Sequence, residues 1–285
     1  MKEMYAIAGI SKQALWKYGK RQEEVALISC QVIDVIKTIR INHKRMGCRK
    51  IYYTTYTNKI IPVGRDMFEQ IGFANGFKLR FKRNAMKTTW GQRVEVYPNL
   101  IEGMILNGIN KVWQSDIFYI KVEGIDYYCV TIEDVYSRKL LALHFSKSLS
   151  SEQNVKALKK ALKTRNGSNI KGCIYHSDRG SQYISNNHKL LLKESGLKIS
   201  MCKMPQENAY VERVQGTLKY EYLFEHKLTK ANLQQMSRKL LHWYNDERPH
   251  SNLKMMTPTV FEQYESRLAK KDKPEMKIYQ GFSKL

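Results

Sequence analysis

The spacing of hydrophobic residues divides the chain into a helical first part and a strand-rich second part that begins near residue 111. Between residues 23 and 41, apolar side chains recur at every third or fourth position, from Val25 to Ile39. This spacing places them on one face of an α-helix. The first part, residues 1–75, is therefore expected to be a small all-helical region.

Shorter helices are expected on both sides of this one. Ser11 can cap a helix over residues 12–18, because its hydroxyl can accept a hydrogen bond from the first turn. Two more helices are expected over residues 47–52 and 63–71, and Gly72 is expected to end the second. Helices joined by short turns are typical of a helix-turn-helix, although a plain helical hairpin has the same pattern.

From residue 112 the period becomes that of β-strands. Runs rich in Ile, Val, Tyr and Phe predict strands at Val112–Val122, Ile125–Ile132 and Leu140–Phe145, with turns at Gly124 and at Ser137 and Arg138. Because these turns are short, the three strands are expected to be antiparallel.

Helices and strands alternate after the third strand. The expected elements are, in order, a helix with a capping box at Ser150 and Gln153, a strand over 172–177, a helix over 186–195 and a strand over 197–201. Three more helices are expected, over residues 207–226, from after Leu228 to about 243, and over 259–268. This order predicts an α/β fold with a ribonuclease H-like mixed five-stranded sheet flanked by helices. In that arrangement the first and fourth strands are neighbours.

The charge of the chain points to an anionic partner. Lysine and arginine number 49 against 26 acidic residues, which gives a net charge of +23. Such a surplus favours a polyanion, and nucleic acid is the first candidate, although charge alone also fits a basic protein without catalytic activity. No apolar run is long enough to cross a membrane, and no signal-peptide pattern opens the chain. The five scattered cysteines indicate free thiols in a reducing cytoplasm.

Basic residues that could contact DNA occur in two stretches. Arg49, Lys50 and Arg65 lie at or near expected helix starts, where they would meet phosphates or simply solvent. A basic linker over residues 76–107 interleaves cations with aromatic residues, and its expected DNA contacts are Arg80, Lys82 and Arg83. A solvated connector has the same composition, so both interpretations of the linker stay open.

Three carboxylates are the candidates for catalysis. Asp116 lies within the first expected strand, Asp178 ends the fourth, and Glu212 lies early on the helix that follows the fifth. An acid inside a half-buried strand is costly unless it is paired or bound to a cation. Mg²⁺ prefers oxygen ligands, and two such ions about 4 Å apart can catalyse phosphodiester cleavage. Asn208 and Lys219 share a helix face with Glu212.

Other titratable residues near these three have simpler interpretations. Glu207 at a helix start favours the helix dipole, and Glu221 lies on a different helix face from Glu212. Asp134 ends the second strand and fits a turn residue. His176 could tune Asp178 or contact phosphate, and a packing role explains it equally well.

Several motifs together resemble the DDE transposases of bacterial insertion sequences, specifically their B-frame product, which shares its core with retroviral integrases. The matching segments are W-x-x-D-I-x-Y at 113–119, Y-S-R at 136–138, H-S-D-R-G-S-Q-Y at 176–183, N-A-x-x-E at 208–212, G-T-L-K-x-E at 216–221 and Y-N-x-x-R-P-H at 244–250. Residues 46–75 are also similar to the helix-turn-helix segment of that family. The resemblance covers most of the chain, and the combination is far more specific than any single motif.

Carried over by position, the resemblance implies a catalytic and metal-binding triad of Asp116, Asp178 and Glu212. It also implies Mg²⁺ or Mn²⁺ as cofactor, with two ions, and DNA contacts from Lys219, together with Arg179 and Asn208. The sequence departs from the family at Phe118, where a small hydroxyl residue is frequent, and at Ser115, where threonine is frequent. The 33 residues between Asp178 and Glu212 are slightly fewer than usual. These departures affect the fine geometry of the site.

The chain pattern and the resemblance together predict a domain organisation and partners. A DNA-binding region (1–75) and the basic linker (76–107) precede a catalytic domain over residues 108–268. A basic tail covers 269–285, and its lysine-rich stretch from Lys270 onward is expected to be loosely held. The expected partners are double-stranded DNA, further copies of the chain on that DNA, and an upstream-frame protein as fusion partner. The expected location is the bacterial cytoplasm, at the nucleoid.

The reaction that the resemblance implies has two phosphoryl-transfer steps. Water first nicks the end of the element and exposes a 3′-hydroxyl, which then attacks a second phosphodiester. Two alternatives stay open: a catalytically inactive basic DNA-binding protein on the same scaffold, and a simple metal-dependent nuclease that cuts without joining.

Overall fold

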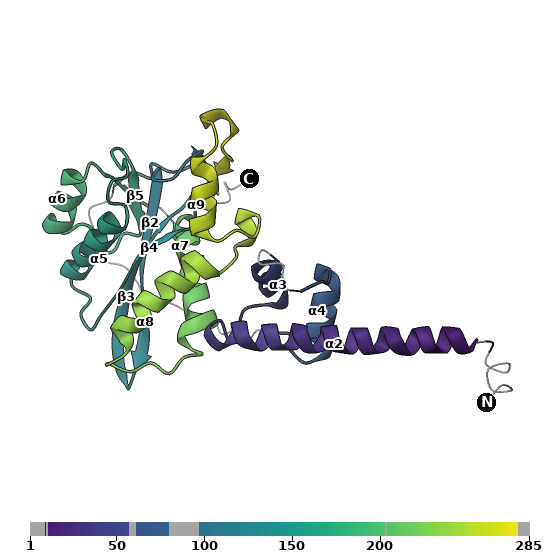
Figure 1. The fold of residues 1–285 in the computed structure, drawn as a ribbon. Coiled ribbons are helices and arrows are strands. Elements are labelled where there is room, and N and C mark those ends of the chain that lie inside the picture. The colour runs from purple at the N-terminus through teal and green to yellow at the C-terminus, as the bar shows by residue number, and fades with distance from the viewer. Residues whose placement is uncertain (1–8, 10, 57–60, 80–96, 203, 279–285) are drawn as a thin grey trace. The chain divides into compact units, whose positions relative to one another are not determined.

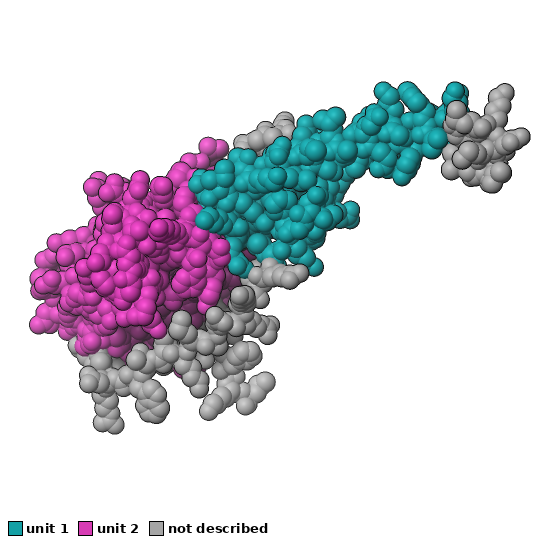
Figure 2. Space-filling model, turned by 90° about the horizontal axis from the view of Figure 1, so that it is seen from below, with its two compact units in different colours: residues 1–82 teal, residues 83–285 magenta. Residues whose placement is uncertain are grey.

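A computed structural model describes residues 9, 11–56, 61–79, 97–202 and 204–278 of the 285-residue chain. The chain forms two compact units, Met1–Lys82 and Arg83–Leu285, which Figure 2 shows in different colours.

The first unit contains three helices, α2 (Lys12–Asn42), α3 (Cys48–Tyr56) and α4 (Arg65–Ala74). Ser11 caps α2 as predicted, because its hydroxyl accepts a hydrogen bond from the amide of Ala14 at 3.0 Å. The prediction of separate helices over 12–18 and 23–41 is wrong, since α2 is one helix of 31 residues. Gly19 alone does not interrupt it, because one glycine costs only about 1 kcal/mol in a helix.

Close packing between α2, α3 and α4 explains a second departure from the prediction. Gly72 lies inside α4, and the helix ends at Asn75, whose amide bonds to the carbonyl of Ile71. A Cβ at position 72 would lie 2.8 Å from Cys48 Sγ and 3.1 Å from Ile36 Cδ1. Gly72 therefore allows the three helices to approach, and the expectation that it ends the helix is wrong.

The second unit is built on a five-stranded sheet whose strand order is β4-β3-β2-β5-β6. Its strands are β2 (Val112–Val122), β3 (Ile125–Asp134), β4 (Leu140–Ser146), β5 (Ile174–Ser177) and β6 (Lys198–Met201). The first three strands are antiparallel, whereas β5 runs parallel to β2 and β6 parallel to β5. The predicted ribonuclease H-like sheet is confirmed, including the neighbouring first and fourth strands.

Helices cover both faces of this sheet (Figure 1). The helices are α5 (Ser151–Thr164), α6 (Asn186–Glu194), α7 (Ala209–Thr217), α8 (Leu233–His242) and α9 (Pro258–Ser266). One apolar cluster joins the sheet to α5 and α6, and another joins its opposite face to α7 and α8. The helix expected over residues 207–226 is instead a 3₁₀ turn (Pro205–Asn208), α7 and a π-helical segment (Leu218–Leu223).

A second, two-stranded sheet lies in stretches expected to be linker and tail. Strand β1 (Ile105–Leu106) pairs antiparallel with β7 (Met276–Lys277). Ile278 is only 3% exposed and packs in an apolar cluster with Leu106. The expectation that the chain is loosely held from Lys270 onward is therefore wrong for the residues up to 278, because pairing and burial fix them.

A buried ion network replaces the simple turn expected at Asp134. Arg165 contacts Asp134 at 3.1 Å and Glu262 at 2.6 Å, and its side chain is 5% exposed. Asp134 also accepts hydrogen bonds from the backbone amides of Asn110, Tyr136 and Ser137. These contacts join β3, α5 and α9 at one end of the sheet.

Glu133, next to this network in sequence, is a buried carboxyl group without a hydrogen-bond partner among the described residues. Burial raises the pKa of Glu133 to about 8, although the positive charge of Arg138 opposes this shift. Between the pKa of an unfolded glutamate and about 8, the folded chain therefore binds more protons than the unfolded chain. Folding stability consequently falls as pH rises through this range.

Glu133→Gln should remove this pH dependence, because glutamine has nearly the same shape and does not ionise. In the unmodified chain, stability is expected to fall by up to about 1.4 kcal/mol per pH unit between roughly pH 5 and pH 8 from this group. Urea denaturation at several pH values measures the slope, and Glu123→Gln, at an exposed turn, is the control. Equal slopes in the variant and the unmodified chain would contradict the assignment.

Candidate active site

The pairing of β2 with β5 brings two of the predicted acids together. The last paired residues of these parallel strands are Ser115 and Ser177, and each is followed directly by a predicted catalytic aspartate. Asp116 and Asp178 therefore occupy corresponding positions on adjacent strands. Both are half-buried. The sheet topology predicted from sequence thus places these two carboxylates side by side.

Buried amide side chains fasten the start of α7 to β2. Gln114, which is fully buried, donates to the carbonyl of Glu207 at 3.0 Å and accepts from the amide of Val211 at 3.3 Å. Asn208 donates to the carbonyl of Ser115 at 3.2 Å. These bonds fix the first turn of α7, and so they position Glu212 on the side of the sheet that carries Asp116.

Mutual repulsion between the three acids is visible at Asp116. Burial raises the pKa of Asp116 to about 7, and the charges of Asp178 and Glu212 contribute, while hydrogen bonds from the amide of Ile117 and from Gln215 oppose the shift. Burial also raises the pKa of Asp178, against a hydrogen bond from the amide of Gly180 at 3.0 Å. Three acids from distant parts of the sequence therefore share one electrostatic environment.

The three carboxylates do not yet form a closed ligand set. Glu212 is exposed at the surface of α7, although its carboxyl group is partly removed from water, which raises its pKa. Among the described residues, no three His, Cys, Asp or Glu side chains are close enough to hold a metal ion. The donor set nevertheless suits a hard divalent cation, because all its ligands are carboxylate oxygens whose repulsion such an ion would relieve.

Two basic residues predicted to contact DNA border these acids. The ammonium of Lys219 lies 4.9 Å from the ring centroid of Phe118. Burial lowers the pKa of Lys219, whereas the charge of Asp116 raises it. Phe118, a departure from the family pattern, thus supports the lysine beside the acids. Arg179 is exposed, and its Nε donates to the carbonyl of Cys202 at 2.9 Å.

Two other residues near the site are buried. Asn208 is 3% exposed and tethers the start of α7 to β2, and its contact with DNA stays a prediction. His176 is fully buried and hydrogen-bonded to Ser200 at 2.9 Å, and burial lowers its pKa to about 4. The packing interpretation of His176 is the one that fits.

In the first unit, the predicted DNA contacts lie at helix starts. Arg49 and Lys50 lie in the first turn of α3, and Arg65 is the first residue of α4. Arg49 and Arg65 are exposed and form ion pairs with Glu69 and Asp66. The other three predicted contacts, in the basic linker, are Arg80, Lys82 and Arg83, and they lie outside the described residues.

Gln114→Leu should slow the reaction more than it weakens DNA binding. The leucine would leave the carbonyl of Glu207 and the amide of Val211 unpaired, at a cost of about 1–3 kcal/mol in folding stability. It would also loosen the turn that holds Glu212. Single-turnover cleavage and fluorescence anisotropy measure the two effects, with exposed Gln235→Leu on α8 as the control. Unchanged cleavage would show that this amide clamp does not position Glu212.

Gln114 is a site residue that the sequence interpretation missed. A signal was present, because the alternation of a strand places residue 114 on the same face as Asp116. A glutamine at a position expected to be buried needs hydrogen-bond partners, and a nearby helix terminus with free backbone groups can supply them.

Comparisons with known proteins identify the family to which this chain belongs. Models of the integrase core domain match residues 107–205 and 195–258. The transposase of insertion sequence IS904 from Lactococcus lactis is 32% identical over 261 residues, covering 87% of this chain and 98% of that protein. An uncharacterized 31 kDa protein of insertion element IS600 from Shigella sonnei is 29% identical over 274 residues, covering 93% and 100%.

The chain is also similar to a solved retroviral integrase core. The catalytic core domain of HTLV-2 integrase, solved in complex with magnesium, is 20% identical with a TM-score of 0.43, covering 54% of this chain and 97% of that one. No helix within the described residues is both long and apolar enough to cross a membrane. On the similarity to the IS904 protein along nearly its whole length, the chain belongs to the DDE transposases of bacterial insertion sequences, enzymes that catalyse DNA transposition.

Proposed function

We propose that Asp116, Asp178 and Glu212 are the catalytic acids of this transposase and that they hold Mg²⁺ or Mn²⁺, as two ions. The observation that supports this most directly is the parallel pairing of β2 with β5, which brings Asp116 beside Asp178. The charges of Asp178 and Glu212 also act on Asp116, whose pKa is raised mainly by burial. Bound metal would activate the attacking oxygen and stabilise the leaving oxygen of a phosphodiester. Because Glu212 is exposed, we expect it to complete the ligand set only when metal and DNA are present.

The remaining residues of the site orient the DNA phosphate. Lys219, supported by the ring of Phe118, is placed to neutralise a phosphate oxygen beside Asp116. Arg179 is exposed next to Asp178 and can contact the backbone of the same strand. The reaction would then be two in-line displacements, first by water and then by the exposed 3′-hydroxyl, with positioning and charge stabilisation as the contribution of the protein.

A gel assay with labelled element-end DNA tests this proposal. With Mn²⁺, the full chain is expected to nick the end and to join it to a second duplex, and without a divalent ion it should do neither. Nicking without joining would indicate a simple nuclease, and binding without nicking would indicate an inactive DNA-binding protein. Either result would contradict the proposed reaction.

The partners of the enzyme follow from the same proposal. We expect the exposed cations Arg49 and Arg65, with Lys50, to contact the backbone of double-stranded DNA, and several copies of the chain to assemble on the element ends at the bacterial nucleoid. An upstream-frame protein would act as a fusion partner. Light scattering of the chain with and without end DNA measures the assembly, and a single copy on paired ends would exclude it.

A further inference from the structure

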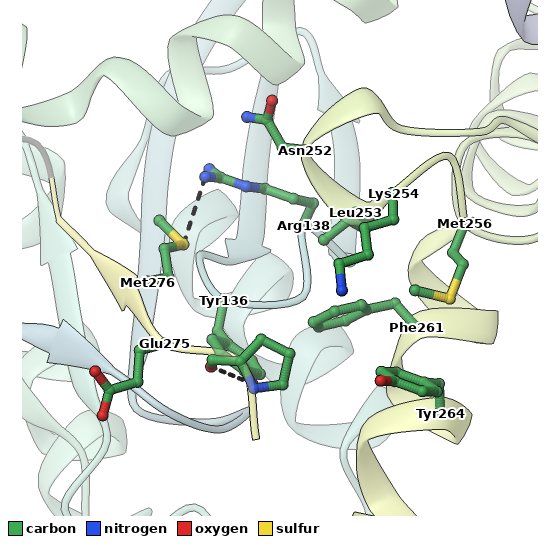
Figure 3. A pocket seen from close by; sticks show the side chains of 11 residues that line it. Tyr136, Arg138, Asn252, Leu253, Lys254, Met256, Phe261, Tyr264, Glu275 and Met276 are labelled. Atoms are coloured by element: carbon green, nitrogen blue, oxygen red, sulfur yellow. Dashed lines mark hydrogen bonds between the residues drawn. The ribbon is translucent and has the colours of Figure 1, made fainter. Parts of the chain in front are cut away.

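A pocket in the second unit, away from the three acids, carries cations and aromatic rings together. It has a volume of about 380 Å³ and lies between the loop after β3, the loop before α9 and strand β7 (Figure 3). Tyr136, Phe261 and Tyr264 provide rings, and Arg138 and Lys254 provide positive charges. The rings of Tyr136 and Phe261 are in contact, with centroids 5.5 Å apart.

The two cations of this pocket lack strong partners. Within the part of the chain that the structure describes, Lys254 has neither an ion pair nor a side-chain hydrogen bond. The only hydrogen bond of the Arg138 side chain there is to the sulfur of Met276 at 3.5 Å, and its Nε is buried without an acceptor. Figure 3 shows Lys254 pointing toward the ring of Phe261, while the carboxylate of Glu275 points away. Two donors are therefore free for an anion.

The backbone around the pocket is held in an uncommon conformation. Among the described residues, five non-glycine residues have a positive φ, and three of them, Arg138, Lys254 and Met255, lie in this pocket or beside it. Such conformations disfavour a Cβ and cluster at functional sites. The loop over residues 250–256 is closed by four backbone hydrogen bonds, so it presents Lys254 rigidly.

Arg138 links the pocket to the helix that carries Glu212. Its guanidinium lies 4.2 Å from the ring centroid of Tyr210, in the first turn of α7. The charge of Arg138 acts on the buried carboxyl of Glu133, where it opposes the rise in pKa that burial causes. An anion in the pocket would therefore be bound beside the helix that carries Glu212.

We propose that this pocket binds one unpaired nucleotide of the DNA substrate, with its base against Tyr264 and Phe261 and its phosphate on Lys254 and Arg138. The proposal rests on DNA being the substrate, as the family membership shows, and does not depend on which residues hold metal. A paired base is stacked within its duplex and cannot enter, whereas an unpaired base can stack on aromatic rings. The overall charge of the chain, +23, favours the same ligand.

Binding to two matched DNA molecules tests the pocket in the presence of EDTA, where no cleavage occurs. One is a blunt fluorescein-labelled duplex, and the other is the same duplex with a short overhang of thymidines. The full chain is expected to bind the overhang duplex roughly tenfold more tightly, because base stacking on a ring adds affinity. Equal affinity for both molecules would overturn the proposal.

Two single variants separate the contributions of ring and charge. Tyr264→Ala should remove most of the preference for the overhang and leave affinity for the blunt duplex unchanged. Lys254→Gln removes the charge and keeps a polar side chain. It should lower the slope of overhang affinity against salt concentration by the amount that one phosphate contact contributes. Lys159→Gln, an exposed lysine on α5, is the control. Retention of the preference in Tyr264→Ala would contradict the proposal.

A second measurement uses the unmodified chain and so does not depend on variant folding. An overhang that contains 5-iodouracil should crosslink under ultraviolet light to Tyr264 or Phe261, as peptide mass spectrometry would show. Crosslinks confined to other aromatic residues would exclude the pocket. Because both measurements depend on binding and not on cleavage, failure of the catalytic proposal can be told apart from failure of this one.

Discussion

Asp178→Asn is expected to abolish DNA cleavage and strand transfer, with a loss of roughly a thousandfold or more, while affinity for DNA remains nearly unchanged. Asparagine has almost the same shape as aspartate, but it lacks the negative charge that a divalent cation requires. Its amide can still occupy the loop after β5, so the fold should persist. Gel assays of cleavage and joining, together with fluorescence anisotropy on the same DNA, measure the two properties separately.

A matched substitution distinguishes the catalytic charge from charge in general. Asp126→Asn removes an aspartate from the start of β3, where it is exposed and paired with Lys121 at 2.9 Å. Surface ion pairs of this kind contribute at most about 1 kcal/mol, so this variant should keep full activity. Strand transfer that survives in Asp178→Asn, or that is equally lost in Asp126→Asn, would remove Asp178 from the active site.

The second large effect is expected in folding stability. Arg165→Met should destabilise the second unit by about 3–5 kcal/mol, because it leaves the carboxylates of Asp134 and Glu262 buried without their shared cation. The methionine fills most of the space of the arginine stem. The lost free energy of unfolding would therefore come from the missing charge and not from a cavity. Guanidinium denaturation measures it, and exposed Lys163→Met on the same helix is the control.

The pH dependence of this network provides an independent check. Burial raises the pKa of Glu262, but hydrogen bonds from Arg165 and Ser137 and the charges of Arg165 and Lys139 outweigh it, so the net pKa is lowered. A lowered pKa stabilises the fold above the pKa of an unfolded glutamate, and this stabilisation is lost as pH falls through the folded value. Arg165→Met should therefore lose less stability than the unmodified chain on acidification below about pH 4.5. An identical acid profile in both would contradict the network.

The sheet could be predicted from the sequence because its signals are local. Gly124 and the alternation on either side of it define β2 and β3, and the order of elements makes β2 and β5 neighbours. The position of Asp116 beside Asp178 follows from that order alone. How far Glu212 lies from these two acids does not follow, since it depends on hydrogen bonds between Gln114 and α7 that involve residues nearly a hundred positions apart.

Other features could not be predicted because they too depend on contacts between residues far apart in the sequence. Gly72 was expected to end a helix by its type, whereas its contact with Cys48 decides its role. Strands β1 and β7 are only two residues long, so they carry no periodicity of their own. The buried carboxyl of Glu133 resembles a surface residue in sequence, and only its neighbours in the folded sheet show otherwise.

The pairing of β1 with β7 has a consequence for how this enzyme could evolve. It brings Ile105, near the start of the second unit, beside Lys277, close to its described end. A domain whose entry and exit points are adjacent can be inserted into, or joined to, other chains without distorting its interior. The β1–β7 pairing would allow the catalytic domain to be recombined with different DNA-binding domains while its own packing stays intact.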